Sequence, residues 1–183
     1  KLADTSAVSY THEKLTSGTK YTYTVRCLDS KGGFISGYDK NGFSNVFLTA
    51  PKLKTVTSVN GGVKVTWSKL KGATGYRVLR KAEGEKKWTE IGTSKSGSFI
   101  DKKVNSGKKY TYTVRCIDAG GKNVSVYGSG KSVKYVKAPV ISKFSNTATG
   151  TKITWKKCSG AAKYRIYCIN SNGKLKKLAD TSA

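Results

Sequence analysis

The stretch YTYTVRC at residues 110–116 decides the fold. Large apolar side chains alternate in it with threonine and arginine, so an extended chain here has one apolar side and one polar side. This two-residue period is typical of a β-strand that covers a core with one face. Cys116, at its end, is expected to act as a small buried hydrophobic residue. The inward-facing side chains are predicted to be Tyr110, Tyr112, Val114 and Cys116.

The same seven residues recur 89 positions earlier, at 21–27, and other segments repeat with them. VKVTW at 63–67 returns as TKITW at 151–155, an offset of 88 residues. The only two prolines, Pro51 and Pro139, are also 88 residues apart. Self-similarity at a fixed period indicates a repeat architecture, and each repeat here is a module of about 88 residues.

The repeats divide the chain into three parts. Residues 1–50 are predicted to be the C-terminal part of one module, 51–138 a complete module, and 139–183 the N-terminal part of the next. Short linkers containing the prolines join the parts, and proline restricts bending at such junctions. We therefore expect consecutive modules to form a semi-rigid rod.

The sequence also has a second repeat that is longer than one module. Residues 1–7, KLADTSA, are identical to residues 177–183, so the larger unit is 176 residues, or two modules. Joining 139–183 to 8–50 gives 88 residues, the length of a complete module. Since two half-sandwiches with open edges would be poorly stable, each part is expected to be completed by sequence beyond this stretch or by another molecule, head to tail.

The other segments of the complete module also favour an all-β fold. Val63, Val65 and Trp67 alternate with lysine and threonine, and Tyr76 and Val78 alternate in the same way. No segment has a sustained 3.6-residue apolar period, so we predict no significant helix. Many short strands separated by turn signals are typical of a β-sandwich.

Two motifs resemble those of fibronectin type III domains. LTSGTKY at 15–21 and VNSGKKY at 104–110 resemble the family's LxPGTxY stretch, with serine in place of proline, and Trp67 and Trp155 match its core tryptophan. The resemblance implies tandem fibronectin type III-like (immunoglobulin-like) β-sandwiches of a bacterial, Gram-positive type cell-surface or secreted repeat protein. It also implies that the motif tyrosine hydrogen-bonds back to the preceding turn. Together with the repeats it assigns a structural core of Tyr21, Tyr23, Cys27, Trp67, Tyr76, Tyr110, Tyr112, Cys116, Trp155 and Tyr164.

The chain is strongly basic, with 35 lysine and arginine residues, 10 acidic residues and a net charge of +25. The basic residues are mostly lysines spread along the chain. Arginine is preferred for bidentate phosphate and base recognition, so this pattern does not favour nucleic-acid binding. It favours a solvated basic surface facing anionic cell-wall polymers or glycans.

The sequence offers no group for catalysis, no cofactor motif and no metal ligand set. His12 is the only histidine, and it aligns with Asp101 of the complete module. No two cysteines have CxxC spacing. The sequence does not decide whether Cys158 and Cys168 pair with each other, with Cys27, or not at all. We therefore predict a protein that is not an enzyme.

The predicted function is structural. No apolar run is long enough to span a bilayer, and near-identical units favour a repeat segment of an extracellular fibre, stalk or spacer, with neighbouring identical repeats as partners. The alternative is a multivalent adhesin or a glycan- or cell-wall-binding accessory module. Tyr38, Phe43 and Tyr127 would supply an aromatic platform in that case, but packing in the core or between strands explains them better, and no site is assigned to them.

Overall fold

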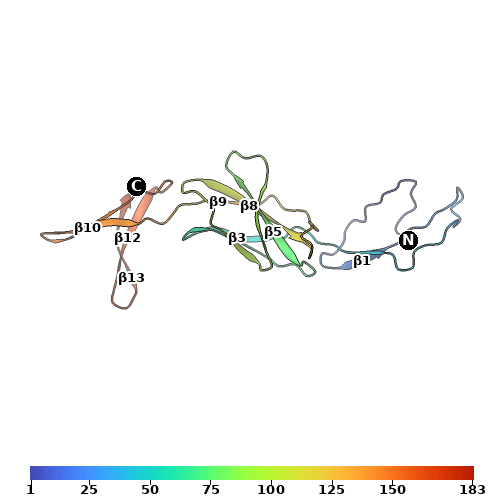
Figure 1. The fold of residues 1–183 in the computed structure, drawn as a ribbon, viewed down its shortest axis with the longest axis horizontal. Helices are drawn as coiled ribbons and strands as arrows, with labels where there is room; N and C mark the ends of the chain where they lie inside the picture. The colour runs from blue at the N-terminus through green and yellow to red at the C-terminus, as the bar shows by residue number, and fades with distance from the viewer.

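The computed structural model describes all residues 1–183 and contains thirteen β-strands and no helix (Figure 1). The all-β prediction is therefore confirmed. Strands β1 and β2 lie toward one end of the long axis, β3–β9 in the middle, and β10–β13 toward the other end. The structure has no helix with the length and apolarity needed to cross a bilayer.

The middle of the chain is a sandwich of two antiparallel sheets. One sheet has the order β3-β4-β7 and the other the order β6-β5-β8-β9. Their strands are β3 (Leu53–Val59), β4 (Gly62–Trp67), β5 (Gly75–Ala82), β6 (Thr89–Ser94), β7 (Ser98–Asp101), β8 (Lys109–Ile117) and β9 (Lys131–Lys134). This arrangement of three strands packed on four is that of a fibronectin type III-like β-sandwich.

The core of the sandwich lies between the two sheets because alternate side chains of β4, β5 and β8 point inward. The Trp67 and Tyr76 rings meet edge to face, with centroids 5.5 Å apart. Full burial of one such large side chain contributes roughly 1.5–3 kcal/mol to folding. The core cluster comprises Leu48, Val63, Val65, Trp67, Tyr76, Val78, Tyr110, Tyr112, Val114, Cys116 and Tyr135. Burial raises the pKa of the Cys116 thiol, so it stays protonated at neutral pH.

The two ends of the chain contain only two-stranded sheets. Near the N-terminus, β1 (Lys20–Tyr23) pairs with β2 (Phe43–Val46). Near the C-terminus there are two hairpins, and neither pairs with the other. They are formed by β10 (Ile141–Thr147) with β11 (Gly150–Trp155), and by β12 (Lys163–Ile169) with β13 (Leu175–Ser182).

The structure differs from the sequence-based prediction at Cys27. This residue was expected in a core but is exposed, because the N-terminal part has no second sheet to cover it. Trp155 and Tyr164 are half-buried for the same reason. Their rings nevertheless lie 5.4 Å apart in an edge-to-face contact, as the rings of Trp67 and Tyr76 do. Tyr21 and Tyr23 are also half-buried.

Candidate functional site: module junctions, a buried polar network and surface aromatics

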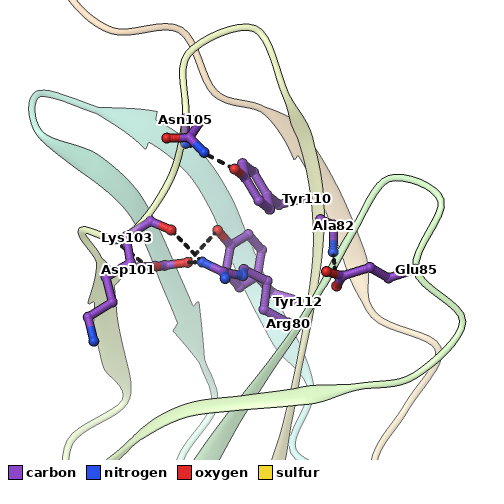
Figure 2. Close-up of polar contacts among 8 residues, drawn as sticks. All are labelled: Arg80, Ala82, Glu85, Asp101, Lys103, Asn105, Tyr110 and Tyr112. Carbon is purple, nitrogen blue, oxygen red and sulfur yellow. Dashed lines mark hydrogen bonds and ion pairs between the residues drawn. The ribbon is translucent and has the colours of Figure 1, made fainter.

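A buried polar network closes one side of the core, where β5, β7 and β8 meet (Figure 2). One Asp101 carboxylate oxygen accepts hydrogen bonds from Arg80 Nη1 and from the Tyr112 hydroxyl, each at 2.9 Å. The other accepts the backbone N–H of Lys103 at 2.9 Å. The Asp101 side chain is only 3% exposed and that of Arg80 20% exposed. The pair is therefore well compensated, as a buried charge must be.

The network also fixes the protonation state of the tyrosine. Burial raises the pKa of Tyr112 well above its usual range, and the charge of Asp101 and the hydrogen bond to it raise it further. The hydroxyl therefore remains a donor at any physiological pH. Sequence reasoning aligned Asp101 with His12 of the preceding part but missed Arg80 as its partner.

The motif tyrosines hydrogen-bond as the family resemblance implies. The Tyr110 hydroxyl accepts the backbone N–H of Asn105 at 2.9 Å (Figure 2). The Tyr21 hydroxyl accepts the backbone N–H of Thr16 at 3.0 Å. Each hydrogen bond connects the start of a strand to the turn before it. The same turns also contact the next part of the chain, as the following two junctions show.

One of these contacts joins the N-terminal part to the middle sandwich. Gly18, in the turn before β1, lies so close to Lys71 that a Cβ atom on the glycine would be 3.0 Å from the Lys71 carbonyl oxygen. Gly72 lies against Val46, whose Cγ1 would be 2.8 Å from an added Cβ. Within the N-terminal part, the turn that makes this contact is held by Ser17 Oγ, which accepts the backbone N–H of Thr49 at 3.1 Å.

The other contact joins the middle sandwich to the C-terminal part, at equivalent positions. Gly107 packs on Ser159, and a Cβ on Gly160 would be 2.6 Å from the Gly107 Cα atom. Ser106 Oγ accepts the Lys137 N–H at 3.0 Å and donates to the Ser159 carbonyl at 2.9 Å. These residues lie 88 or 89 positions after their counterparts at the first contact. The glycine contacts of the two junctions therefore correspond, and the hydrogen bond from Ser106 to the Ser159 carbonyl is an additional contact of the second junction.

Aromatic rings gather on the outer side of the four-stranded sheet. The Trp88 and Tyr127 rings are 5.9 Å apart, edge to face. Lys81 Nζ lies 4.6 Å from the Trp88 ring centre, and the Arg115 guanidinium lies 5.4 Å from that of Tyr127. Tyr127 is 41% exposed. Sequence reasoning named Tyr127 for such a platform but did not pair it with Trp88.

The other two residues named for that platform lie in the N-terminal part. The Arg26 guanidinium lies 5.4 Å from the Tyr38 ring centre, the same distance as that between Arg115 and Tyr127. Phe43 is an exposed residue of β2. An arginine stacked on a tyrosine thus recurs at positions 89 residues apart.

The structure contains no cluster of three or more histidine, cysteine or carboxylate residues that could hold a metal ion. All four cysteines are free. Cys116 and Cys158 are buried, whereas Cys27 and Cys168 are exposed.

Comparison with curated proteins finds bacterial relatives. The chain is 31% identical over 148 residues to Exoglucanase B of Cellulomonas fimi, and this match covers 73% of this chain and 13% of that protein. It is 36% identical over 78 residues to an amylopullulanase of Thermoanaerobacterium saccharolyticum, and this match covers 40% of this chain and 6% of that protein. The chain thus spans only a small fraction of the length of these relatives.

No family model matches the chain. Among solved structures, it is similar to an Fn3-like protein from Clostridium thermocellum, with a TM-score of 0.39 and 25% identity. That match covers 48% of this chain and 88% of the other. A β-1,2-glucanase from Parabacteroides distasonis matches with a TM-score of 0.42 and 19% identity, over 48% of this chain and 12% of the enzyme.

Proposed function

We propose that this chain, which contains a fibronectin type III-like β-sandwich, is a structural repeat segment of an extracellular fibre, stalk or spacer. Its modules would be residues 51–138 and the combination of 139–183 with sequence equivalent to 8–50. Neighbouring identical repeats would be its partners. The relatives are named for enzymes that act on polysaccharides, which supports a location outside the cell.

The observation that carries the proposal is the recurrence of the junction. A spacer needs the same geometry at each joint, because only then does its length grow by a constant step. Gly18 with Lys71, and Gly107 with Ser159, are close contacts between equivalent turns. Packing this tight leaves little room for one module to rotate on the next.

Solution scattering tests this geometry. The maximum dimension of the 183-residue chain would be compared with that of a chain in which the 176-residue unit is repeated twice. A semi-rigid rod would lengthen almost in proportion to the number of units. Dimensions that grow roughly as the square root of length would indicate flexible joints and contradict the proposal.

A pair of glycine variants tests the junction itself. Gly107 and Gly84 both have a positive φ, 86° and 89°, so alanine strains the backbone similarly at both positions. Only Gly107 has a neighbour, since nothing lies within 4 Å of a Cβ placed on Gly84. Gly107→Ala should therefore shorten the maximum dimension and broaden its distribution, whereas Gly84→Ala should not. Equal effects of the two variants would show that the junction does not hold the modules in place.

A second candidate function is a multivalent adhesin or accessory module that binds glycans or anionic cell-wall polymers. The Trp88–Tyr127 pair favours it, because an exposed ring face can stack on a sugar and the flanking Lys81 and Arg115 can meet an anionic group. Repetition of a weak site would raise avidity without any new contact.

Co-sedimentation with insoluble cellulose, starch and purified bacterial cell wall separates the two functions. A binding module should be retained on one of these polymers, and Trp88→Ala should release it at unchanged salt. Phe144→Ala is the matched control, because Phe144 is an exposed aromatic residue of β10 that belongs neither to the pair nor to the other candidate platform residues. Retention that salt abolishes and that Trp88→Ala leaves unchanged would instead be diffuse attraction to the basic surface.

A further inference from the structure

Within residues 1–183, two strands of the C-terminal part pair on one side only, whereas their counterparts in the middle sandwich pair on both sides. In the sandwich, β4 pairs with both β3 and β7, and β5 pairs with both β6 and β8. In the C-terminal part, β11 pairs only with β10, and β12 only with β13. The segments equivalent to β7 and β8 are residues 9–12 and 20–28 of the N-terminal part.

The register of the sandwich shows which residues would meet if these segments supplied the missing neighbours. Val63 faces Asp101, and Arg80 faces Tyr112. Transferred by the 88- and 89-residue offsets, the second pairing becomes Cys168 with Tyr23, and the position of Asp101 becomes that of His12. A completed module would thus place Cys168, His12 and Tyr23 where the middle sandwich has its buried polar network.

Half of this second network already exists in the structure. His12 Nδ1 and the Tyr23 hydroxyl are hydrogen-bonded at 3.1 Å. This contact corresponds to the 2.9 Å hydrogen bond from Tyr112 to Asp101. Only the residue from β12 is missing, and Cys168 is exposed on that strand.

The two positions have therefore changed together. In the middle sandwich the pair is Arg80 and Asp101, a cation and an anion that compensate each other. In the completed module it would be Cys168 and His12, a thiol and an imidazole, neither of which carries the permanent charge of a guanidinium. A half of the middle module could also combine with an end part. Such a mixed module would bury either the Asp101 carboxylate against the Cys168 thiol or the Arg80 guanidinium against the His12 imidazole. Each mismatch leaves a buried charge without its counterion, which is strongly unfavourable.

We propose that these matched core pairs determine which halves combine, so that residues 139–183 bind sequence equivalent to residues 8–50, which a second copy of this chain can supply. A half that carries Arg80 or Asp101 does not combine with an end part, because its charge would be buried without a counterion. The half that carries the matching thiol or imidazole does combine. This inference rests on the proposed function, because it assumes that the two end parts form one module.

A double-mutant cycle on the full chain tests the matched pair. The four chains are the wild type, His12→Asp, Cys168→Arg, and the variant with both changes. Each is examined by sedimentation velocity across a concentration series, with a reductant present so that no intermolecular disulfide can form. The wild type should associate head to tail. Each single variant should associate about 100-fold more weakly, because it buries an unpaired charge. The double variant should recover to within about tenfold of the wild type, because it restores the compensated pair of the middle sandwich.

Amide spectra of the middle sandwich provide an internal control. Unchanged signals from β5 and β8 in all four chains show that a loss of association is not a loss of folding. Additive losses in the double variant would overturn the matched-pair inference, while association of the wild type would still support the repeat array. A wild type that stays monomeric, with the amides of β11 and β12 exchanging freely, would overturn both the inference and the completion of one end part by the other.

Discussion

Replacement of Asp101 should be the most damaging single change in the polar network of the middle sandwich. Its carboxylate accepts hydrogen bonds from Arg80, Tyr112 and the backbone of Lys103, all at 2.9 Å. Asp101→Ala leaves the guanidinium without its counterion and the fully buried Tyr112 hydroxyl without an acceptor. Removing one member of a buried ion pair costs about 3–5 kcal/mol.

The structure places the expected cost toward the lower end of that range. Arg80 retains a hydrogen bond to the Lys103 carbonyl at 2.6 Å, and its side chain is 20% exposed. We therefore expect Asp101→Ala to lower the free energy of unfolding by about 3 kcal/mol. Asp101→Asn keeps an acceptor for Tyr112 and should cost about 1–2 kcal/mol, and Tyr112→Phe about 1 kcal/mol.

Urea titration at pH 7 measures these differences, with the amide signals of β5 and β8 followed so that only the middle sandwich is observed. The matched control is the triple variant Arg80→Met, Asp101→Leu and Tyr112→Phe, which removes both charges and the buried hydroxyl that Asp101 accepts, since replacing a whole buried polar set by apolar residues is often nearly neutral. The reasoning would be refuted if Asp101→Ala unfolded within about 0.5 kcal/mol of the wild type, the usual range for surface substitutions. It would also be refuted if the triple variant were as unstable as Asp101→Ala.

Three further predictions concern tyrosines and the C-terminal hairpin. Because the pKa of Tyr112 is raised in the folded state, its contribution to stability is present below pH of about 10 and lost at higher pH. Urea titrations between pH 8 and 11 should show this loss in the wild type and a smaller loss in Tyr112→Phe, in which Tyr76 and Cys116, whose pKa values are also raised, still contribute. The hydrogen bond from Arg165, together with one from Lys177, lowers the pKa of Asp180 to about 2. The contribution of this carboxylate to the stability of the hairpin is therefore present above pH of about 4 and lost as the pH falls toward about 2. An NMR titration of the Asp180 carboxyl carbon should give that pKa, and Arg165→Gln should raise it. Tyr110→Phe should cost about 1 kcal/mol in thermal unfolding, because it removes the acceptor for the preceding turn, and no change in the unfolding temperature would contradict that role.

Much of the fold could be predicted because the information is local. The alternation at 110–116 matches β8, and the segment 63–67 lies in β4. Both strands face a core whose other side comes from the same chain, so the apolar period corresponds directly to burial. Trp67 and Tyr112 are accordingly among the most buried side chains.

The repeated sequence KLADTSA shows where local information is insufficient. At 177–183 it belongs to β13, which pairs with β12, and Arg165 faces Asp180 across the hairpin. At 1–7 the identical residues form no strand. A strand needs a neighbour to satisfy its backbone N–H and C=O groups, and within residues 1–183 only the second copy of this sequence has one. The conformation of these seven residues is therefore determined by their partner, which their own sequence does not contain.

The polar network could not be predicted from alternation for a related reason. Arg80 lies on the same side of β5 as Tyr76 and Val78, so a charged residue stands on an apolar face, and the pattern alone gives no partner for it. That partner is 21 residues away on the other sheet, and only the register of β4 with β7 and of β5 with β8 brings Asp101 to it. A comparison between modules does contain the signal. Because Arg80 corresponds to Cys168 and Asp101 to His12, the two positions differ together, as they must if a buried charge is never left without its counterion. Such paired changes between repeats of one chain report a contact even where no strand pattern does.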